Sequence, residues 1–220
     1  MTNLKTLISS RFQLLTYIAL SMMLSGFLLL LRIKLNQSFY YLFLVWNLFL
    51  AFIPFCITLY LRSKTQVTKT KLFIYFTIWL LFLPNAPYII TDLLHFKRST
   101  SHFLWLDILM VISFAINGLV LFYLTLLDME SLLKKFMHTK TIKILLIAIF
   151  FLTGFGIYLG RFLRFNSWDI LQHPEMLIES IFEILITPTQ HLEAWAFTFC
   201  FGAFLSLTYH VIKSIKQTNL

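Results

Sequence analysis

Six long apolar runs constrain the fold of this 220-residue chain more than any other feature. Each run is continuous and about twenty residues long, and a helix of that length, rising about 1.5 Å per residue, crosses a hydrocarbon core about 30 Å thick. The fifth run is only just long enough. The runs are Phe12 to Leu31, Phe39 to Leu61, Leu72 to Ile90, Phe103 to Leu127, Ile144 to Gly160 and Ala194 to Ile212.

These runs favour helices over strands. Inside a lipid bilayer every backbone polar group needs a partner within the protein, which leaves α-helices or closed β-barrels. Barrel strands alternate apolar and polar residues over about ten positions, and the runs show no such alternation. The sequence therefore predicts an all-α fold, a polytopic bundle of six transmembrane helices forming a single membrane domain over residues 1–220.

The composition excludes the other broad classes of protein. Residues of the set AVILMFWYC make up 59% of the chain, charged residues only 12%, and the mean hydropathy is +0.83. Soluble domains carry about 25% charged residues, and disordered chains are far less apolar. Two cysteines are too few for a disulfide scaffold.

The distribution of the cations predicts the orientation. With six spans, both termini share one side of the membrane with the second and fourth loops, and that side holds twelve of the eighteen Lys and Arg residues. Basic loops stay in the cytoplasm, so both termini are expected there. The expected partner is the lipid bilayer, whose anionic headgroups face these cations. Nucleic acid is not an expected partner, because the cations lie in short loops and not on a folded basic face.

The connection between the fifth and sixth runs contains a further helical pattern. Pro174 suits the first position of a helix, and acidic residues follow at every fourth position. These are Glu175, Glu179 and Glu183. The pattern predicts an amphipathic helix over about 175–187 that lies along the interface or enters the membrane as a re-entrant segment. An acidic stripe that is merely solvated is the simpler interpretation of the three glutamates.

Polar residues gather at the predicted outer ends of the spans. The third span runs outward and ends in a segment that Pro84 and Pro87 are expected to break or kink. The fourth span begins outside and the fifth ends there, so polar groups far apart in sequence reach one membrane face. We expect one pocket that opens outward. Its expected lining is Asn85, Asp92, Asp107, Arg161, Arg164, Asn166 and Asp169, with Trp105, Tyr158 and Trp168 at its rim.

These residue types suggest a site for an anionic lipid or cell-envelope precursor. Arg161 and Arg164 would hold phosphate or carboxylate oxygens as forked donors, and Asn85 and Asn166 would orient the ligand. Trp168 and Asp169 complete the candidate ligand-binding set. Asp92 and Asp107 are the candidates for catalytic acid or base, so enzyme and binding protein both stay open. No cofactor and no metal site is expected, because the sequence has no His-x-x-x-His pair and no P-loop.

Two other functional classes are alternatives. A small-solute transporter needs polar groups along its whole route, and the predicted cytoplasmic halves of the spans are almost purely apolar. In a structural or assembly protein, the polar cluster would hold helices together. Asp107 with Arg161 would then be an interhelical salt bridge, and Asn47 and Asn117 would form interhelical hydrogen bonds.

Four strings of the sequence also resemble a known family. They are NLFLAFIP (Asn47 to Pro54), LFLPNAPYIITDLLH (Leu81 to His95), WLD (Trp105 to Asp107) and GIYLGRFLRFNSWD (Gly156 to Asp169). The chain resembles an uncharacterised bacterial family of multi-span membrane proteins, a domain of unknown function. The resemblance implies a multi-pass protein of the bacterial cytoplasmic (plasma) membrane. It implies no activity and no catalytic residues.

Overall fold

The computed structural model describes residues 4–98 and 104–218, and all of the regular secondary structure in these ranges is helical. Six of the helical segments are long and apolar enough to cross a membrane, so the predicted fold class is confirmed. They are Phe12–Asn36, Tyr40–Ser63, Lys69–Leu94, Leu104–Leu133, Thr139–Arg161 and Leu192–Ile215. Phe103, the expected start of the fourth span, lies outside the described residues.

The chain divides into two compact units, Met1–Phe136 and Met137–Leu220. The expected single membrane domain stays a prediction. The elements of the first unit are α1 (Leu4–Ser10), α2 (Phe12–Asn36), η1 (Tyr40–Leu42), α3 (Phe43–Ser63), α4 (Lys69–Phe82), α5 (Asn85–Tyr88), η2 (Ile89–Arg98) and α6 (Leu104–Leu133). Those of the second unit are α7 (Thr139–Arg161), α8 (Asp169–Gln172), α9 (Pro174–Ile186) and α10 (Leu192–Thr218).

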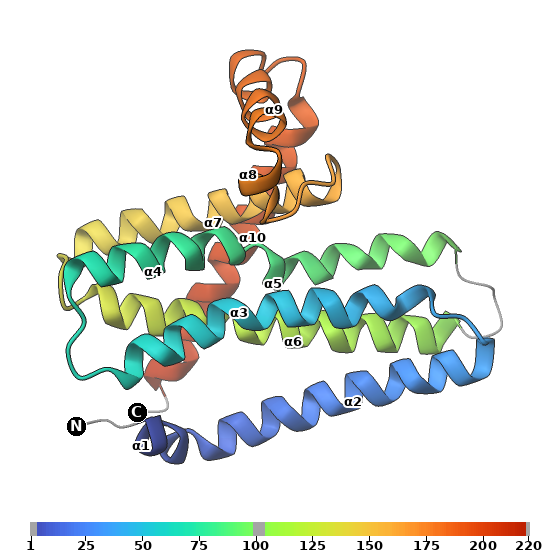
Figure 1. Ribbon diagram of the computed structural model, residues 1–220, viewed down its shortest axis with the longest axis horizontal. Coiled ribbons are helices and arrows are strands. Elements are labelled where there is room, and N and C mark those ends of the chain that lie inside the picture. The colour runs from blue at the N-terminus through green and yellow to red at the C-terminus, as the bar shows by residue number, and fades with distance from the viewer. Residues whose placement is uncertain (1–3, 99–103, 219–220) are drawn as a thin grey trace. The chain divides into compact units, whose positions relative to one another are not determined.

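Helix α6 is the central element of the first unit. It packs against α2, α3, α5 and η2, and Figure 1 shows α2, α3 and α6 running side by side. Its buried positions include a series at intervals of seven, Asp107, Phe114, Leu121 and Asp128. A seven-residue repeat keeps one face of a helix toward its partner along the whole length of a left-handed pair. The two aspartates therefore lie on the same buried seam as the apolar residues between them.

Helix α2 has the matching seam. Ile18, Ser25 and Arg32 are buried at intervals of seven, and Arg11 stands seven residues before Ile18. Ser25 Oγ accepts a hydrogen bond of 2.9 Å from Asn117 Nδ2 of α6, halfway along the two helices. This bond confirms the interhelical role that the sequence suggested for Asn117.

The third span is broken as predicted. Helix α4 ends at Phe82, and the chain continues through the four-residue α5 into the 3-10 helix η2. Two prolines remove backbone donors here, so an unbroken α-helix would lose its hydrogen bonds. The short helix α5 lies very close to α6, because a Cβ atom built on Gly118 would be 2.3 Å from the carbonyl oxygen of Ala86. Only glycine allows the backbones to approach this closely.

The second unit is built around the α7–α10 contact. A Cβ atom on Gly154 would lie 2.8 Å from the carbonyl oxygen of Thr198, and one on Gly202 would lie 2.7 Å from the Phe151 ring. Close approach of small residues is the usual way for helices to associate in lipid, where apolar burial supplies little force.

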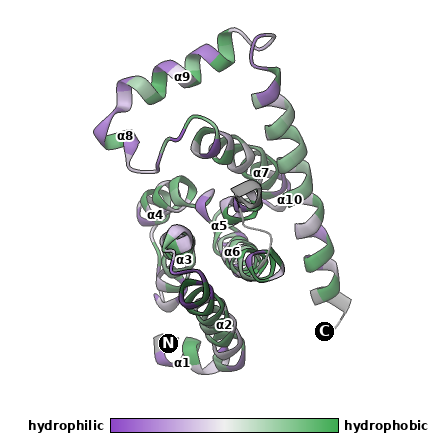
Figure 2. Cartoon of the chain, turned by 90° about the vertical axis from the view of Figure 1, so that its right-hand side faces the viewer, coloured by the Kyte–Doolittle hydropathy of each residue, from purple (hydrophilic) through white to green (hydrophobic). Residues whose placement is uncertain are grey.

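Helix α9 confirms that the acidic pattern forms a helix. Ile184 is buried with Tyr158 and Ala194, whereas Met176 and Phe182 are exposed. Figure 2 shows hydrophilic and hydrophobic residues alternating along α9. Its position at a membrane interface stays a prediction.

Candidate functional site

Asp107, one of the two catalytic candidates, lies in a buried ion pair within the first unit. It stands in the first turn of α6 and is 0% exposed. Arg32 of α2 donates from Nε to Oδ1 and from Nη2 to Oδ2, the latter at 3.0 Å. Tyr41 Oη donates to the same Oδ2 at 3.3 Å, and the Arg32 guanidinium lies 5.7 Å from the Tyr41 ring centre. Both carboxylate oxygens therefore accept charge-assisted bonds in the forked geometry that arginine favours.

This geometry gives Asp107 a partner that the sequence did not suggest. Arg32 donates both of these guanidinium bonds. The pairing of Asp107 with Arg161, which belongs to the second unit, stays a prediction. Arg32 is not among the predicted site residues, although it follows the first apolar run on the predicted face where Asp107 begins the fourth span. The sequence could have identified Arg32 as a partner, because Arg32 and Asp107 are predicted to lie at the same membrane face. Acid or base chemistry at Asp107 would require breaking a buried ion pair, so its geometry favours a structural role.

Asp92, the second catalytic candidate, is also buried and bonded. It lies in η2, is 1% exposed, and its Oδ2 accepts a hydrogen bond of 3.0 Å from Asn47 Nδ2 of α3. This bond gives Asn47 the interhelical role suggested by the sequence. Asn85 donates from Nδ2 to the carbonyl oxygen of Phe82 at 2.9 Å, so its amide bonds to the end of α4 next to the proline break.

The opposite end of the first unit holds a charge cluster that the predicted pocket did not include. Asp128 of α6 accepts from Arg11 Nη1 at 2.7 Å and from Arg11 Nη2 and Arg62 Nη1 at 2.6 Å each. The side chains of Arg11 and Arg62 are 19% and 30% exposed. Two cations share one carboxylate, so this end has an excess of positive charge.

Between the two ends, a hydroxyl of α6 joins three helices. Thr125 Oγ1 donates to the carbonyl oxygen of Pro54 at 2.9 Å and accepts from Trp79 Nε1 at 2.8 Å. Thr58 Oγ1 lies 3.1 Å from the same atom. A fully buried tryptophan usually needs a partner for its N–H, and Thr125 provides one.

The remaining predicted ligand residues lie together in the second unit, in the segment 161–169, which we name the α7–α8 hook. They are Arg161, Arg164, Asn166, Trp168 and Asp169. After α7 ends at Arg161, the chain turns back and the N–H of Phe165 donates to the carbonyl oxygen of Leu159 at 3.1 Å. Arg164 has a φ of 62°, a left-handed conformation, three residues beyond the last residue of α7.

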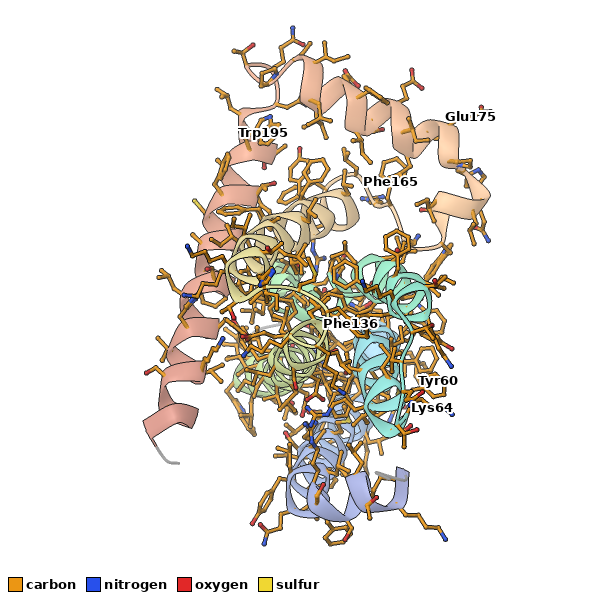
Figure 3. The ribbon with its side chains drawn as sticks, turned by 90° about the vertical axis from the view of Figure 1, so that its left-hand side faces the viewer. Tyr60, Lys64, Phe136, Phe165, Glu175 and Trp195 are labelled. Atoms are coloured by element: carbon orange, nitrogen blue, oxygen red, sulfur yellow. The ribbon has the colours of Figure 1, made fainter. Side chains whose placement is uncertain are left out.

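Asp169 closes the other side of the hook. Its Oδ2 accepts from the backbone N–H of Asn166 at 2.7 Å, and its own N–H donates to the carbonyl oxygen of Asn166 at 3.0 Å. This reciprocal pair occupies one carboxylate oxygen of Asp169, which is buried, and leaves the Arg164 and Asn166 side chains exposed. Figure 3 shows Phe165 in the hook that follows α7. The hook thus presents an exposed guanidinium and amide on a backbone held at both sides.

The predicted pocket combined residues of both units. Asn85, Asp92 and Asp107 lie in the first unit and bond to different neighbours, and the other lining residues lie in segment 161–169 of the second unit. Joining the two parts into one pocket stays a prediction. Among the described residues, no group of three or more His, Cys, Asp or Glu side chains could hold a metal ion.

Comparison with known proteins identifies a family but no individual relative. A family model described as "Protein of unknown function (DUF1361)" matches residues 46–208. No curated protein and no solved structure matches the chain. The matched range contains all four strings that suggested the resemblance, and it covers α4 to α9 completely. The chain belongs to the DUF1361 family of proteins of unknown function.

Proposed function

We propose that this multi-pass membrane protein binds an anionic lipid or a cell-envelope precursor at the α7–α8 hook. Arg161 and Arg164 would hold phosphate or carboxylate oxygens of the ligand, and the exposed amide of Asn166 would orient it. Arginine suits this role because its planar guanidinium donates two parallel hydrogen bonds to such groups.

The backbone of Arg164 is the observation that carries the proposal. The left-handed conformation costs a residue with a Cβ atom about 1–2 kcal/mol, and glycine adopts it without that cost. The chain nevertheless places an exposed arginine there. Strained backbone conformations cluster at functional sites, where the strain accompanies the fixed placement of a side chain.

The charge distribution of the sequence supports the same assignment. The hook is predicted to lie on the outer side, which has only six of the eighteen cations, and two of those six are Arg161 and Arg164. The general rule that basic residues stay inside therefore does not account for these two arginines. Binding of an anionic ligand would account for them.

The buried aspartates favour binding over catalysis. The carboxylates of Asp92 and Asp107 both accept hydrogen bonds from neighbouring helices and are almost inaccessible to solvent. A general acid or base must come within hydrogen-bonding distance of a substrate proton. We therefore assign the hook a binding role and give the two aspartates a part in holding the helices together.

Two substitutions of Arg164 test the proposal. Arg164→Gly removes both the charge and the backbone strain, whereas Arg164→Gln removes only the charge. After mild purification, mass spectrometry of the bound lipids should show at least a tenfold loss of the anionic ligand in both variants. Thermal unfolding should show that the glycine variant is the more stable of the two, because glycine adopts positive φ without cost.

The control is Lys34→Gln, which removes an exposed cation on the same predicted side. This variant should retain the ligand. If Arg164→Gly gains stability and keeps its full complement of bound lipid, the hook is only a turn of the chain and the proposal is wrong.

A structural or assembly role is the second candidate, favoured by the ion pair of Arg32 with Asp107. A protein that only braces its helices should tolerate the exchange of the two charges, Arg32→Asp with Asp107→Arg. If this double variant restores folding and any cellular phenotype lost in the single variants, and the hook variants have no phenotype, the structural role is the better assignment.

A further inference from the structure

Two lysines converge on one tyrosine where α3 ends and α4 begins. The Nζ atoms of Lys64 and Lys71 lie 4.8 Å and 5.4 Å from the centre of the Tyr60 ring, and Lys71 Nζ donates to Tyr60 Oη at 3.4 Å. The ring of Tyr75 lies 5.4 Å from that of Tyr60. We name these four residues the Tyr60 cluster. Figure 3 shows Tyr60 and Lys64 close together near the end of α3.

Local sequence explains why the two lysines meet. Tyr60 and Lys64 are four residues apart at the end of α3, so they lie on one face of the helix. Thr68 caps α4 by accepting a hydrogen bond of 3.3 Å from the backbone N–H of Lys71. The cap sets the first turn of α4 and so places Lys71 beside the end of α3.

The cluster has an unbalanced positive charge. Arg62, two residues before Lys64, forms an ion pair with Asp128. Within the described part of the chain, neither Lys64 nor Lys71 has a carboxylate within ion-pair distance. Both ammonium groups are close to the same ring, so they lie within about 10 Å of each other, a distance at which like charges are only partly screened at physiological salt. An anion between them would relieve this repulsion.

We propose that the Tyr60 cluster binds the phosphate group of an anionic lipid. The two ammonium groups donate to phosphate oxygens, and the Tyr60 hydroxyl, which accepts from Lys71, donates its own proton to a third oxygen. Ile74 and Ile78 follow Lys71 on one face of α4 and are 53% and 41% exposed. They would contact the acyl chain below the headgroup, which favours a lipid over free phosphate. Basic residues between transmembrane helices commonly bind lipid headgroups in this way.

This proposal does not rest on the one made for the hook, because the cluster belongs to the first unit and the hook to the second. It also assigns a ligand to the end of the spans that is predicted to be cytoplasmic. Lys64, Lys69 and Lys71 all belong to the predicted cytoplasmic second loop.

The test compares two double variants of the full chain in a neutral detergent. Lys64→Gln with Lys71→Gln removes the cluster's charge, and Lys135→Gln with Lys140→Gln removes the same charge from two other exposed lysines of the predicted cytoplasmic side. Phosphatidylglycerol and phosphatidylcholine are titrated in, and bound lipid is measured by native mass spectrometry. Every chain compared also carries Arg164→Gly, so that lipid held at the hook does not contribute. We expect phosphatidylglycerol to bind the cluster variant at least tenfold more weakly than the chain with all four lysines, and the control variant within twofold of it.

Two further measurements separate the alternatives. Tyr60→Phe keeps the ring and should weaken binding of phosphatidylglycerol by a few-fold, less than the double lysine variant. Inorganic phosphate should not displace the lipid. Equal losses in both double variants would show unspecific attraction, and displacement by inorganic phosphate would show a free-phosphate site; either result overturns the proposal.

Discussion

The two ends of the first unit join α2 to α6 with the same chemistry in different surroundings. At one end Arg32 holds Asp107, and the side chains are 7% and 0% exposed. At the other end Arg11 and Arg62 hold Asp128, and both arginines reach the solvent-accessible surface. The spacing is the same on both helices, because Arg11 and Arg32 are 21 residues apart, as are Asp107 and Asp128.

This spacing explains how the pairs lie at both ends of one seam. Twenty-one residues are three heptads, and along a helix they span about 30 Å, the thickness of a hydrocarbon core. The antiparallel helices therefore carry their ion pairs to the two edges of the expected apolar layer, with the bond between Asn117 and Ser25 between them.

The difference between the ends shows how burial sets the stability that is lost when an ion pair is broken. When one partner of a buried pair is removed, the other charge remains without compensation, at a cost of about 3–5 kcal/mol. When the remaining partner can turn toward water, the loss of folding stability is small, typically about 0.2–1 kcal/mol. The Asp107 end should therefore be required for folding, and the Asp128 end should tolerate change.

The largest expected effect is that of Asp107→Asn. It leaves the Arg32 guanidinium buried without its counter-charge and should lower the free energy of unfolding by about 3–5 kcal/mol. Asp128→Asn should cost clearly less, because Arg11 and Arg62 can turn to solvent. Unfolding of both variants in one detergent checks the difference. Asp107→Leu combined with Arg32→Met should recover most of the loss, and equal losses at the two ends would contradict the comparison.

A smaller effect is expected for Gly118→Ala, which tests the close packing of α5 against α6. The new methyl group would meet the carbonyl oxygen of Ala86 and displace α5, at a cost of about 1–3 kcal/mol. Hydrogen exchange should then increase in η2, which carries Asp92, and should not increase in α1. Gly26→Ala is the matched control, because nothing lies within 4 Å of its added Cβ atom. If both variants unfold alike, the close approach of α5 to α6 has no energetic importance.

The smallest effect is expected for Arg62→Gln at the Asp128 end. It removes one of two arginines from Asp128 and should cost about 0.2–1 kcal/mol. The loss should shrink at high salt, because screening already weakens exposed ion pairs. The cost of Arg32→Gln should persist under the same conditions, since buried charges are screened much less. Thermal unfolding at low and high salt measures both, and a salt-dependent loss for Arg32→Gln would show that its pair is open to solvent.

The helices of this protein could be predicted because their signals are local. Twenty apolar residues in a row, two prolines in the third span and a glutamate at every fourth position of α9 each act within one segment. The structure has these helices and the break after Phe82, and some helices extend beyond the apolar runs. Charged residues continue such helices at the membrane edge, which is why Asp128 lies within α6 although the apolar run ends before it.

The partners of the polar residues could not be predicted in the same way. Several arginines were expected at the face that carries Asp107, and spacing along the chain does not distinguish among them. Arg32 holds Asp107 because α2 packs against α6 in an antiparallel register that places two heptad seams together. The left-handed backbone of Arg164 also gave no signal, because the sequence has an arginine in a conformation that glycine adopts most readily.

The amino-acid sequence alone determined that this protein is helical, how many helices can span a membrane and where they break, because the bilayer requires each segment to satisfy its own backbone. Only the tertiary structure decided which charges are buried together and which stay at the surface. Ion pairs depend on distances of a few ångströms between helices far apart in sequence, and those distances are set by packing.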